Sequence, residues 1–298
     1  MTRATPTDII LWLGLAAAWS SSYAVIKVGV QTVDPLILVT GRMIIATVVL
    51  LGTFSALGHR LSRHPSDWLS YAVTGMLGSV VPFLLITYGE QTVDSALAAI
   101  LMGFTPVATA TLAASLLPDE RLTAQIVVGL VGALCGVVLL VGPHTLTYLG
   151  EQVGGQAAVL AATICYAAST VYIRRYVKRP PLELAAGSSL VGATSLIAAA
   201  SILGANIDSI EFTTTSLGAI VYLGLISTAA ANLIYFYLVP RLGATRMSQV
   251  NFAVPVGGAL LGLIVLGEAL ELRQTIALAI IVGSVWIVTT AKQQVASD

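Results

Sequence analysis

The side chains of this sequence that could bind a small solute are hydroxyls, amides and aromatic rings inside long apolar stretches. An aromatic ring that carries one polar atom can stack against another ring and still hydrogen-bond an amine or a carboxylate. An amide in an apolar stretch must find a hydrogen-bond partner, either on a neighbouring helix or on a solute. The residues expected to line a solute cavity are Trp19, Ser20, Tyr23, Ser79, Thr105, Tyr166, Ser169, Tyr172, Asn232 and Asn251. For each of them, ordinary packing or a hydrogen bond between helices is the alternative.

Three charged residues near one end of these stretches form a second candidate group. Arg42 lies about seven residues into its apolar stretch, roughly 10 Å deep at about 1.5 Å per residue. Lys27 lies one turn from the end of the first stretch, and Glu90 closes the third. We expect Lys27 or Arg42 to attract the carboxylate of a solute, or to form an outer gate with Glu90 or Asp94. The alternative is a structural ion pair, or side chains that extend towards the lipid headgroups.

The residue combinations needed for catalysis, metal binding or ATP hydrolysis are missing from the sequence. A membrane-embedded enzyme needs paired acids, clustered histidines or a nucleophile beside its base, and no such set is found at one depth. The histidines are scattered over predicted loops, and Cys135 and Cys165 lie inside apolar runs, so a metal site is not expected. No glycine-rich loop precedes a Lys-Ser or Lys-Thr pair. We therefore expect no catalytic residue, no metal, no cofactor and no use of ATP.

The composition predicts a membrane protein. Of 298 residues, 57% are hydrophobic and 9% are charged, whereas a soluble domain carries roughly 25% charged residues. The 14 Lys and Arg residues balance the 14 Asp and Glu residues, so the formal net charge is zero. Without an excess of positive charge, binding to nucleic acid is not expected. The expected partners are a small-molecule solute and membrane lipid.

Cutting the apolar stretches at Pro, Gly and charged residues predicts ten membrane spans, each long enough to cross a hydrocarbon core of about 30 Å. The spans are 9–31, 35–57, 67–89, 94–117, 123–141, 153–174, 182–203, 216–239, 244–266 and 274–291. The first span could imitate a secretory signal, but its apolar run continues to Val33 and is longer than that of a signal. The short connections leave no room for a soluble domain, so the function must lie within the membrane.

Basic residues between the spans predict the orientation, because Lys and Arg near span ends stay in the cytoplasm. If the N-terminus is cytoplasmic, most Lys and Arg residues fall on cytoplasmic segments. They are Arg3, Arg60, Arg63, Arg121, Arg174, Arg175, Lys178, Arg179, Arg241, Arg246 and Lys292. We therefore predict an all-α, multi-pass protein of the cytoplasmic membrane with both termini on the cytoplasmic side.

Ten spans divide into two sets of five, and an odd number per set makes the second set enter the membrane upside down. Sliding the chain by 149 residues places residues 20–23 on residues 169–172 and Pro106 on Pro255. The matched positions lie at equivalent depths. We predict two five-helix repeats of opposite orientation, residues 1–149 and 150–298, with a cavity at their interface near the middle of the membrane.

Prolines inside three spans lie close to the middle of the membrane: Pro82, Pro106 and Pro255. Each proline removes one helical N–H and loosens the hydrogen bonding one turn earlier. We expect these prolines to act as hinges or to line the cavity; a tolerated kink that packs against neighbours is the alternative. Glycines four residues apart allow close helix packing within one chain or between two, so a monomer or a homodimer is expected. These glycines are Gly132 with Gly136 and Gly258 with Gly262.

Short motifs spread over essentially the whole chain resemble those of one transporter superfamily. They are Trp19-Ser20-Ser21-Ser22-Tyr23 in the first span, Asp34-Pro35 followed by Arg42, Pro106 with Pro118 to Arg121, and Pro255 with Gly267-Glu268. On these residues the chain resembles the drug/metabolite transporter superfamily, and within it the EamA-type ten-span carriers. The resemblance implies a basket of two inverted five-helix repeats that moves solutes by alternating access. Exporters of aromatic amino acids are the sub-branch that the chain resembles most.

No charged residue lies at the middle of a predicted span, where a charge would cost about 2.5–3.5 kcal/mol. We therefore expect an uncharged cavity, which favours a neutral or zwitterionic solute. Sugar-phosphate and nucleotide-sugar carriers of the same superfamily need basic residues to bind phosphate. Such solutes are not favoured here, because no basic residue is predicted at the middle of the membrane. Together with the resemblance, this predicts a secondary transporter that exports small metabolites such as amino acids with aromatic or bulky side chains. The alternatives are a carrier for drug-like or sugar-related solutes, a membrane-embedded enzyme, or a membrane subunit that transports nothing.

Overall fold

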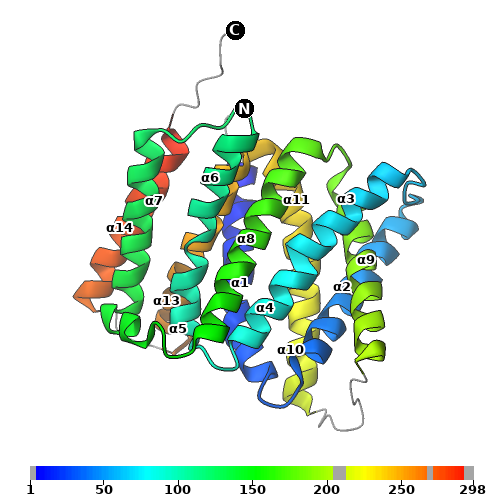
Figure 1. The fold of residues 1–298 in the computed structure, drawn as a ribbon, viewed down its shortest axis with the longest axis horizontal. Coiled ribbons are helices and arrows are strands. Elements are labelled where there is room, and N and C mark those ends of the chain that lie inside the picture. The colour runs from blue at the N-terminus through cyan, green and yellow to red at the C-terminus, as the bar shows by residue number, and fades with distance from the viewer. Residues whose placement is uncertain (1–4, 204–212, 267–270, 292–298) are drawn as a thin grey trace.

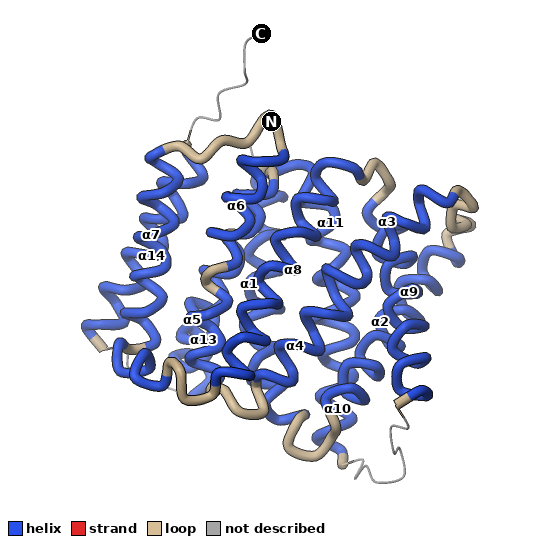
Figure 2. Tube along the Cα trace, viewed as in Figure 1, coloured by secondary structure: helices blue, strands red, loops and turns tan. Residues whose placement is uncertain are grey.

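The computed structural model describes residues 5–203, 213–266 and 271–291. Throughout these residues the chain forms helices and no strand (Figure 1, Figure 2). The α-helices are α1 (Pro6–Gly29), α2 (Pro35–Ala56), α3 (Pro65–Gly75), α4 (Val81–Gly89), α5 (Ser95–Met102), α6 (Thr105–Leu116), α7 (Ala124–Val141), α8 (Val153–Tyr176), α9 (Pro181–Ile202), α10 (Thr214–Gly224), α11 (Ala231–Leu242), α12 (Ala244–Ser248), α13 (Val250–Leu266) and α14 (Leu272–Thr290). The π-helices η1 (Met76–Val80) and η4 (Leu225–Ala230) join α3 to α4 and α10 to α11. A short 3₁₀-helix, η2 (Pro143–Tyr148), follows α7.

Nine helical segments of the described residues are long and apolar enough to cross a membrane. They agree with nine predicted spans to within about three residues at either end: Pro6–Gly29, Pro35–Ala56, Pro65–Gly89, Leu97–Leu116, Ala124–Val141, Val153–Tyr176, Pro181–Ile202, Thr214–Leu242 and Leu272–Thr290. The predicted span 244–266 contains α12 and the 17-residue α13 and is not among these nine, so a total of ten spans stays a prediction. The segments are helical because a chain in lipid must satisfy its N–H and C=O groups within each segment.

The first helices of the two halves run in opposite directions (Figure 1). Arg241, in the last turn of α11, pairs with Asp8 at the start of α1. Arg174, in the last turn of α8, donates a hydrogen bond to the carbonyl of Pro240 on the same α11. The start of α1 and the end of α8 therefore lie at the same end of the molecule. The halves are inverted, whereas the boundary between residues 149 and 150 stays a prediction.

The helices of the two halves are interleaved. α1 packs against α10, α11 and α13, α2 packs against α9 and α10, and both α4 and α6 pack against α8. α7 and α14 form a further pair, in which Gly132 and Gly136 face α14, and a Cβ on Gly132 would lie 2.6 Å from Oγ of Ser284. These two glycines therefore close a contact within the chain, while the packing of Gly258 and Gly262 lies outside the described side chains.

Irregularities of the helices recur at the predicted repeat distance. η1 begins at Met76 and η4 begins 149 residues later, at Leu225. Pro82 lies in the first turn of α4, directly after η1, where a missing N–H is tolerated. Pro106 lies in the first turn of α6, directly after the break between α5 and α6, whereas Pro255 lies inside α13. Two of the predicted hinge prolines thus stand beside a π-helix or a break, and the third stands within a continuous helix.

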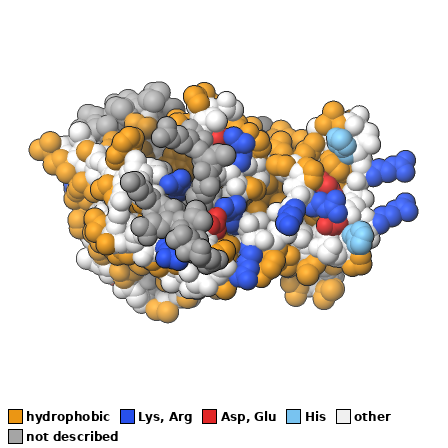
Figure 3. Space-filling view, turned by 90° about the horizontal axis from the view of Figure 1, so that it is seen from above, with side chains coloured by type: hydrophobic (Ala, Val, Ile, Leu, Met, Phe, Trp, Pro, Cys, Tyr) orange, Lys and Arg blue, Asp and Glu red, His pale blue; other side chains and the backbone are white. Residues whose placement is uncertain are grey.

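Lys and Arg side chains mark one end of the molecule. The end at which α1 begins carries several of them at separate places on its surface (Figure 3), including the exposed Arg63, Arg121 and Lys178. We call it the basic end. The distribution of Lys and Arg predicts that this end faces the cytoplasm. Lys27 and Glu90 lie at the other end, which we call the outer end.

Candidate functional site

A central cavity lies between the two halves of the chain. Helices α1, α2, α4, α5 and α6 of the first half and α8, α11, α12 and α13 of the second contribute to its wall. The cavity holds about 640 Å³ of space between atoms, including the part that is open to solvent. Its wall consists of Trp19, Ser22, Tyr23, Ile26, Arg42, Phe83, Ile86, Met102, Thr105, Tyr166, Thr170, Tyr235, Ser248, Asn251 and Val254. A wall of apolar and aromatic side chains with a few polar groups is typical of small-molecule sites.

Half of the residues predicted to line a cavity are found in this wall: Trp19, Tyr23, Thr105, Tyr166 and Asn251. The hydroxyl of Thr105 is buried and has no hydrogen-bond partner among the described residues. Asn251 donates from Nδ2 to the carbonyl of Ser248 at 3.0 Å, which leaves its amide oxygen to accept a hydrogen bond from a solute. In this wall, the hydroxyl of Thr105 and the amide oxygen of Asn251 are therefore not used in hydrogen bonds between helices.

The other half lie away from the wall: Ser20, Ser79, Ser169, Tyr172 and Asn232. The hydroxyl of Ser79 accepts a hydrogen bond from Nδ2 of Asn232 at 3.4 Å. This contact joins η1 to α11, as in the alternative of a bond between helices. Ser20 donates to the carbonyl of Ala16 at 2.6 Å and faces a second cavity. Ser79 and Asn232 therefore support the scaffold.

Ser169 and Tyr172, on α8, contact neighbouring helices. A Cβ on Gly78 would lie 2.8 Å from Oγ of Ser169, so this serine packs on η1. The hydroxyl oxygens of Tyr172 and Ser70 lie 3.5 Å apart, which joins α8 to α3. The sequence placed these residues at a depth in the membrane, but depth does not say which side of a helix faces the cavity.

Several wall residues were not predicted from the sequence, and Tyr235 is the most informative of them. Its ring centroid lies 5.7 Å from that of Trp19, and its hydroxyl is hydrogen-bonded to Oγ1 of Thr170. Thr170 follows Tyr166 by one helical turn. Residues three or four apart share one face of a helix. Helical spacing from Tyr166 was therefore the signal that could have found Thr170, whereas Asn232, the predicted residue nearest to Tyr235 in the sequence, does not line the cavity.

The wall carries a positive charge, which corrects the expectation of an uncharged cavity. Arg42 lies in the wall and has 3% of its surface exposed. Its guanidinium carbon is 3.9 Å from the ring centroid of Phe83, and Nε donates to Oγ1 of Thr228 at 3.0 Å. No carboxylate of the described chain pairs with Arg42. The expectation failed because it used the depth of the backbone, whereas the long side chain lies along the cavity.

Lys27 and Glu90 adjoin at the outer end, but not through opposite charges. Lys27 donates from Nζ to the backbone carbonyl of Glu90 at 2.9 Å. The Glu90 side chain, one residue beyond the span Pro65–Gly89, is fully buried, and neither carboxyl oxygen has a partner in the described structure. Burial raises the pKa of Glu90 to about 8, although the charge of Lys27 opposes this rise. The predicted outer gate stays a prediction; in this conformation its ion pair is not formed, and Arg42 lies on the cavity wall.

A second cavity, more open than the first, lies on the outer-end side of the central one. We call it the outer cavity. It is lined by Ser20, Tyr23, Ala24, Lys27, Val28, Ala99, Leu140, Val141, Val254, Pro255, Ala259 and Gln274. Tyr23 and Val254 belong to both walls. These two side chains therefore form part of the partition between the central and the outer cavity.

Ion pairs join the two halves at the basic end. In each of them the carboxylate belongs to residues 1–149 and the guanidinium to residues 150–298. The basic-end ion pairs are Asp8 with Arg241 at 2.8 Å, Asp119 with Arg174 at 2.5 Å, and Asp67 with Arg179. The Glu120 carboxylate also accepts hydrogen bonds from the N–H groups of Ala244, at 2.6 Å, and Thr245, at 2.9 Å. No such carboxylate–arginine pair joins the halves at the outer end of the described structure.

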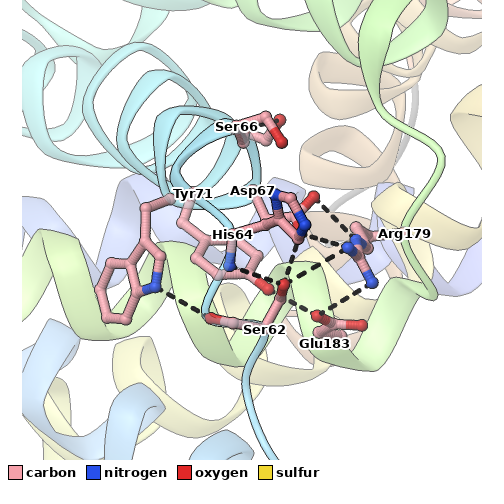
Figure 4. Close-up of polar contacts among 9 residues, drawn as sticks. Ser62, His64, Ser66, Asp67, Tyr71, Arg179 and Glu183 are labelled. Carbon is pink, nitrogen blue, oxygen red and sulfur yellow. Dashed lines mark hydrogen bonds and ion pairs between the residues drawn. The ribbon is translucent and has the colours of Figure 1, made fainter.

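Figure 4 shows the network around Asp67, which is the most connected of these contacts. Arg179, in the loop before α9, donates from Nε to Oδ1 of Asp67 at 2.8 Å. Ser62 donates to the same carboxylate at 2.5 Å, and Tyr71 donates to Oε1 of Glu183 at 2.6 Å. The network ties the start of α3 to the start of α9, so the two halves cannot separate here without breaking charged hydrogen bonds.

Comparison with known proteins matches the chain twice to the EamA-like transporter family, over residues 7–142 and 153–290. An uncharacterized transporter of Archaeoglobus fulgidus is 28% identical, with 93% of this chain and 98% of the relative covered. The uncharacterized inner membrane transporter YedA of Escherichia coli is 28% identical, with 92% and 88% covered. A probable terminal-alkyne amino-acid exporter of Streptantibioticus cattleyicolor is 28% identical, with 84% and 82% covered.

A solved crystal structure has the same fold. It superposes with a TM-score of 0.78 at 23% sequence identity, and the match covers 96% of this chain and 98% of that chain. The two family matches fall on either side of the predicted boundary between residues 149 and 150. Each half of the chain therefore carries one copy of the family domain.

Proposed function

The chain belongs to the EamA-like transporter family and is a multi-pass transporter of the cell membrane; from this we propose that it exports small zwitterionic metabolites, amino acids above all, by alternating access. The proposal takes the basic end as the cytoplasmic side. Arg42 carries it: a buried guanidinium lies in a mostly apolar wall, and no carboxylate of the described chain neutralises it. A zwitterionic solute would bring its own carboxylate to this position.

Arg42 is held so that part of its guanidinium is left for a ligand. Nε is used by Thr228, and the plane rests on the ring of Phe83, while Nη1 and Nη2 donate to no described residue. An arginine fork binds a carboxylate through two parallel hydrogen bonds. In a cavity with few other polar groups, such a pair is worth more than at a hydrated surface. Arg42 is therefore our candidate for the carboxylate subsite.

Two backbone carbonyls are candidates for the ammonium subsite. Met102 and Asn251 lie in the cavity wall and are 149 residues apart, at equivalent positions of the two halves. Each lies four residues before a proline, Pro106 or Pro255, which has no N–H to donate to that carbonyl. Carbonyls freed in this way near the middle of a membrane protein are tolerated where they line a cavity. Ammonium groups are the natural ligands of such oxygens.

The remaining wall favours an apolar or aromatic solute side chain. Trp19, Tyr166 and Tyr235 supply rings with one polar atom each, which can stack against a ring or cover an aliphatic chain. The relative from Streptantibioticus cattleyicolor has a name that describes a probable exporter of a terminal-alkyne amino acid. That name supports amino acids as the substrate class.

The two ends of the cavity support alternating access. The basic-end ion pairs hold the halves together on the proposed cytoplasmic side, while the outer cavity reaches Tyr23 from the other side. Loading from the cytoplasm would require these ion pairs to separate. Export then consists of a change between this arrangement and one that is open at the basic end.

Transport by purified protein in liposomes tests the proposal. We expect uptake of amino acids with aromatic or bulky side chains, and little competition from the amides or N-acetyl forms of the same amino acids, which each lack one charge. Arg42→Gln should reduce the transport of zwitterions at least tenfold. Arg121→Gln, which changes an exposed arginine of the basic end, is the matched control and should transport normally. Normal amino-acid transport by Arg42→Gln would contradict the proposal. Competition by the amides or N-acetyl forms as strong as that by the amino acids themselves would also contradict it.

A further inference from the structure

Glu90 presents a buried carboxyl group that the solute path described above does not use. None of its surface is exposed, and neither of its oxygens has a hydrogen-bond partner among the described residues. An ionised carboxylate in this place would lose its hydration and would be offset only in part by the charge of Lys27; proteins avoid that cost by keeping the group protonated. The neutral acid is the form that fits the surroundings of Glu90 in this conformation.

The ionisable groups that act on Glu90 come from α1. Nζ of Lys27 lies 2.9 Å from the backbone carbonyl of Glu90. The hydroxyl of Tyr23, one turn before Lys27 on α1, feels the charge of the Glu90 carboxylate when that group is ionised. α2 and α8 also pack against α4, and the ionisable side chains that they place on the cavity wall are Arg42 and Tyr166. A turn of the Lys27 side chain from this carbonyl to the carboxyl of the same residue would form an ion pair. Glu90 could therefore exchange its proton for an ion pair.

Glu90 itself lines neither cavity, but residues beside it line both. Lys27 lines the outer cavity, and Tyr23 lines the outer and the central cavity. Ile86, one turn before Glu90 on α4, lines the central cavity. A movement of α1 against α4 that opens or closes the path between the cavities would therefore change the surroundings of the carboxyl group.

We propose that Glu90 is a proton-binding site whose occupancy is linked to the conformation of the transporter. The carboxyl is neutral in the arrangement seen here, with Lys27 on the backbone carbonyl. When the outer end closes, the O–H bond breaks, the proton passes to cavity water, and the carboxylate pairs with the Lys27 ammonium. Protonation from the outer side breaks this pair and restores the present arrangement. The consequence of this linkage rests on the proposed function: the export of solute is coupled to the entry of protons.

Infrared spectroscopy tests the proton site without any solute. We expect a carboxylic-acid band that disappears as the pH is raised through about 8, present in the wild type and absent in Glu90→Gln. Glu151→Gln removes an exposed acid and is the control, which should keep the band. The same band in Glu90→Gln, or its loss in the pH range of an ordinary glutamate, would overturn the proposal. Because no solute is present, this result does not depend on the transport activity.

Transport measurements in liposomes test the linkage. We expect a proton gradient to drive amino-acid accumulation by the wild type and by Glu90→Asp, which keeps an ionisable group. Glu90→Gln should lose this proton-driven accumulation at least tenfold and keep the exchange of one amino acid for another. Exchange activity also shows that the variant is folded and that the proposed function holds. Two results would overturn the linkage. One is proton-driven accumulation by Glu90→Gln at the wild-type rate. The other is the loss of proton-driven accumulation in both Glu90→Gln and Glu90→Asp.

Discussion

Replacing Asp119 with asparagine should open the basic end more often. Oδ2 of Asp119 lies 2.5 Å from Nη2 of Arg174, and the two side chains are 37% and 21% exposed. A hydrogen bond between charged groups stabilises by about 1.5–3 kcal/mol, and an exposed ion pair by about 0–1 kcal/mol. A value for this partly buried pair that lies between the two ranges is about 1.4 kcal/mol, which corresponds to a factor of about ten in an equilibrium constant. Asparagine keeps the shape and removes the charge, so the population open at the basic end should rise about tenfold.

Labelling of a cysteine in the cavity measures that population. Ser248 lines the central cavity, and 2% of its surface is exposed. Ser248→Cys, made in a chain in which Cys135 and Cys165 are replaced by alanine, should react slowly with a maleimide that is added to the basic end and does not cross membranes. Because the reaction needs the open conformation, Asp119→Asn should raise its rate about tenfold.

The control for this experiment is an ion pair that does not join the halves. Glu271 pairs with Arg273 at 3.4 Å, and both residues belong to the second half. Glu271→Gln should leave the labelling rate unchanged. If Asp119→Asn labels Ser248→Cys no faster than the parent does, the basic-end ion pairs do not hold this end closed, and the reasoning from the structure is wrong.

Three further predictions concern packing, the cavity wall and pH. Gly129→Ala should lower the free energy of unfolding by about 1–3 kcal/mol, because its Cβ would lie 2.4 Å from a side chain of α14. Gly52→Ala is the control and should not lower it, because its Cβ would meet nothing within 4 Å. Thermal unfolding in detergent compares the two variants. Tyr235→Phe keeps the ring and loses the hydrogen bond to Thr170, so the KM for amino acids should rise by a few-fold, for about 0.5–1.5 kcal/mol, with little change in kcat; an unchanged KM would show that this hydroxyl does not shape the site. The pKa of Glu90 is raised in the folded protein from 4.5 to about 8, so folding favours the protonated form. The free energy of unfolding should therefore fall as the pH rises from about 4.5 to about 8, and it should level off above that range. If a thermal-unfolding series shows the same fall for Glu90→Gln, the assignment of this fall to Glu90 is wrong.

The fold could be predicted because apolar length and periodicity act locally. Runs of about 20 apolar residues are helical in lipid wherever they stand, and nine predicted spans match helices of the structure. The repeat distance of 149 residues, seen first at Pro106 and Pro255, also relates Met76 to Leu225, where the π-helices begin. The π-helices themselves were not predicted, because an extra residue in one turn leaves no mark in an apolar run.

The candidate site was predicted in part, and the errors have a common cause. Ser20 and Ser22 lie at nearly the same depth, but two residues turn a helix by about 200°, so only Ser22 lines the central cavity. Arg42 was placed by its backbone near the outer end, although its side chain lies along the cavity wall. Facing direction and side-chain reach depend on the neighbouring helices, which a single sequence does not reveal.

The π-helix in each half offers a way for the helix that follows it to rotate about its axis. A π-turn contains one residue more than an α-helical turn, and one residue corresponds to about 100° around the axis. Phe83 follows η1, and Tyr235 follows η4, each within one or two turns. If a wide turn tightened into α-helix, the stretch after it would swivel by that angle and carry its aromatic ring off the solute path. The same helix could thus present two different faces to the central cavity without unfolding and without bending elsewhere.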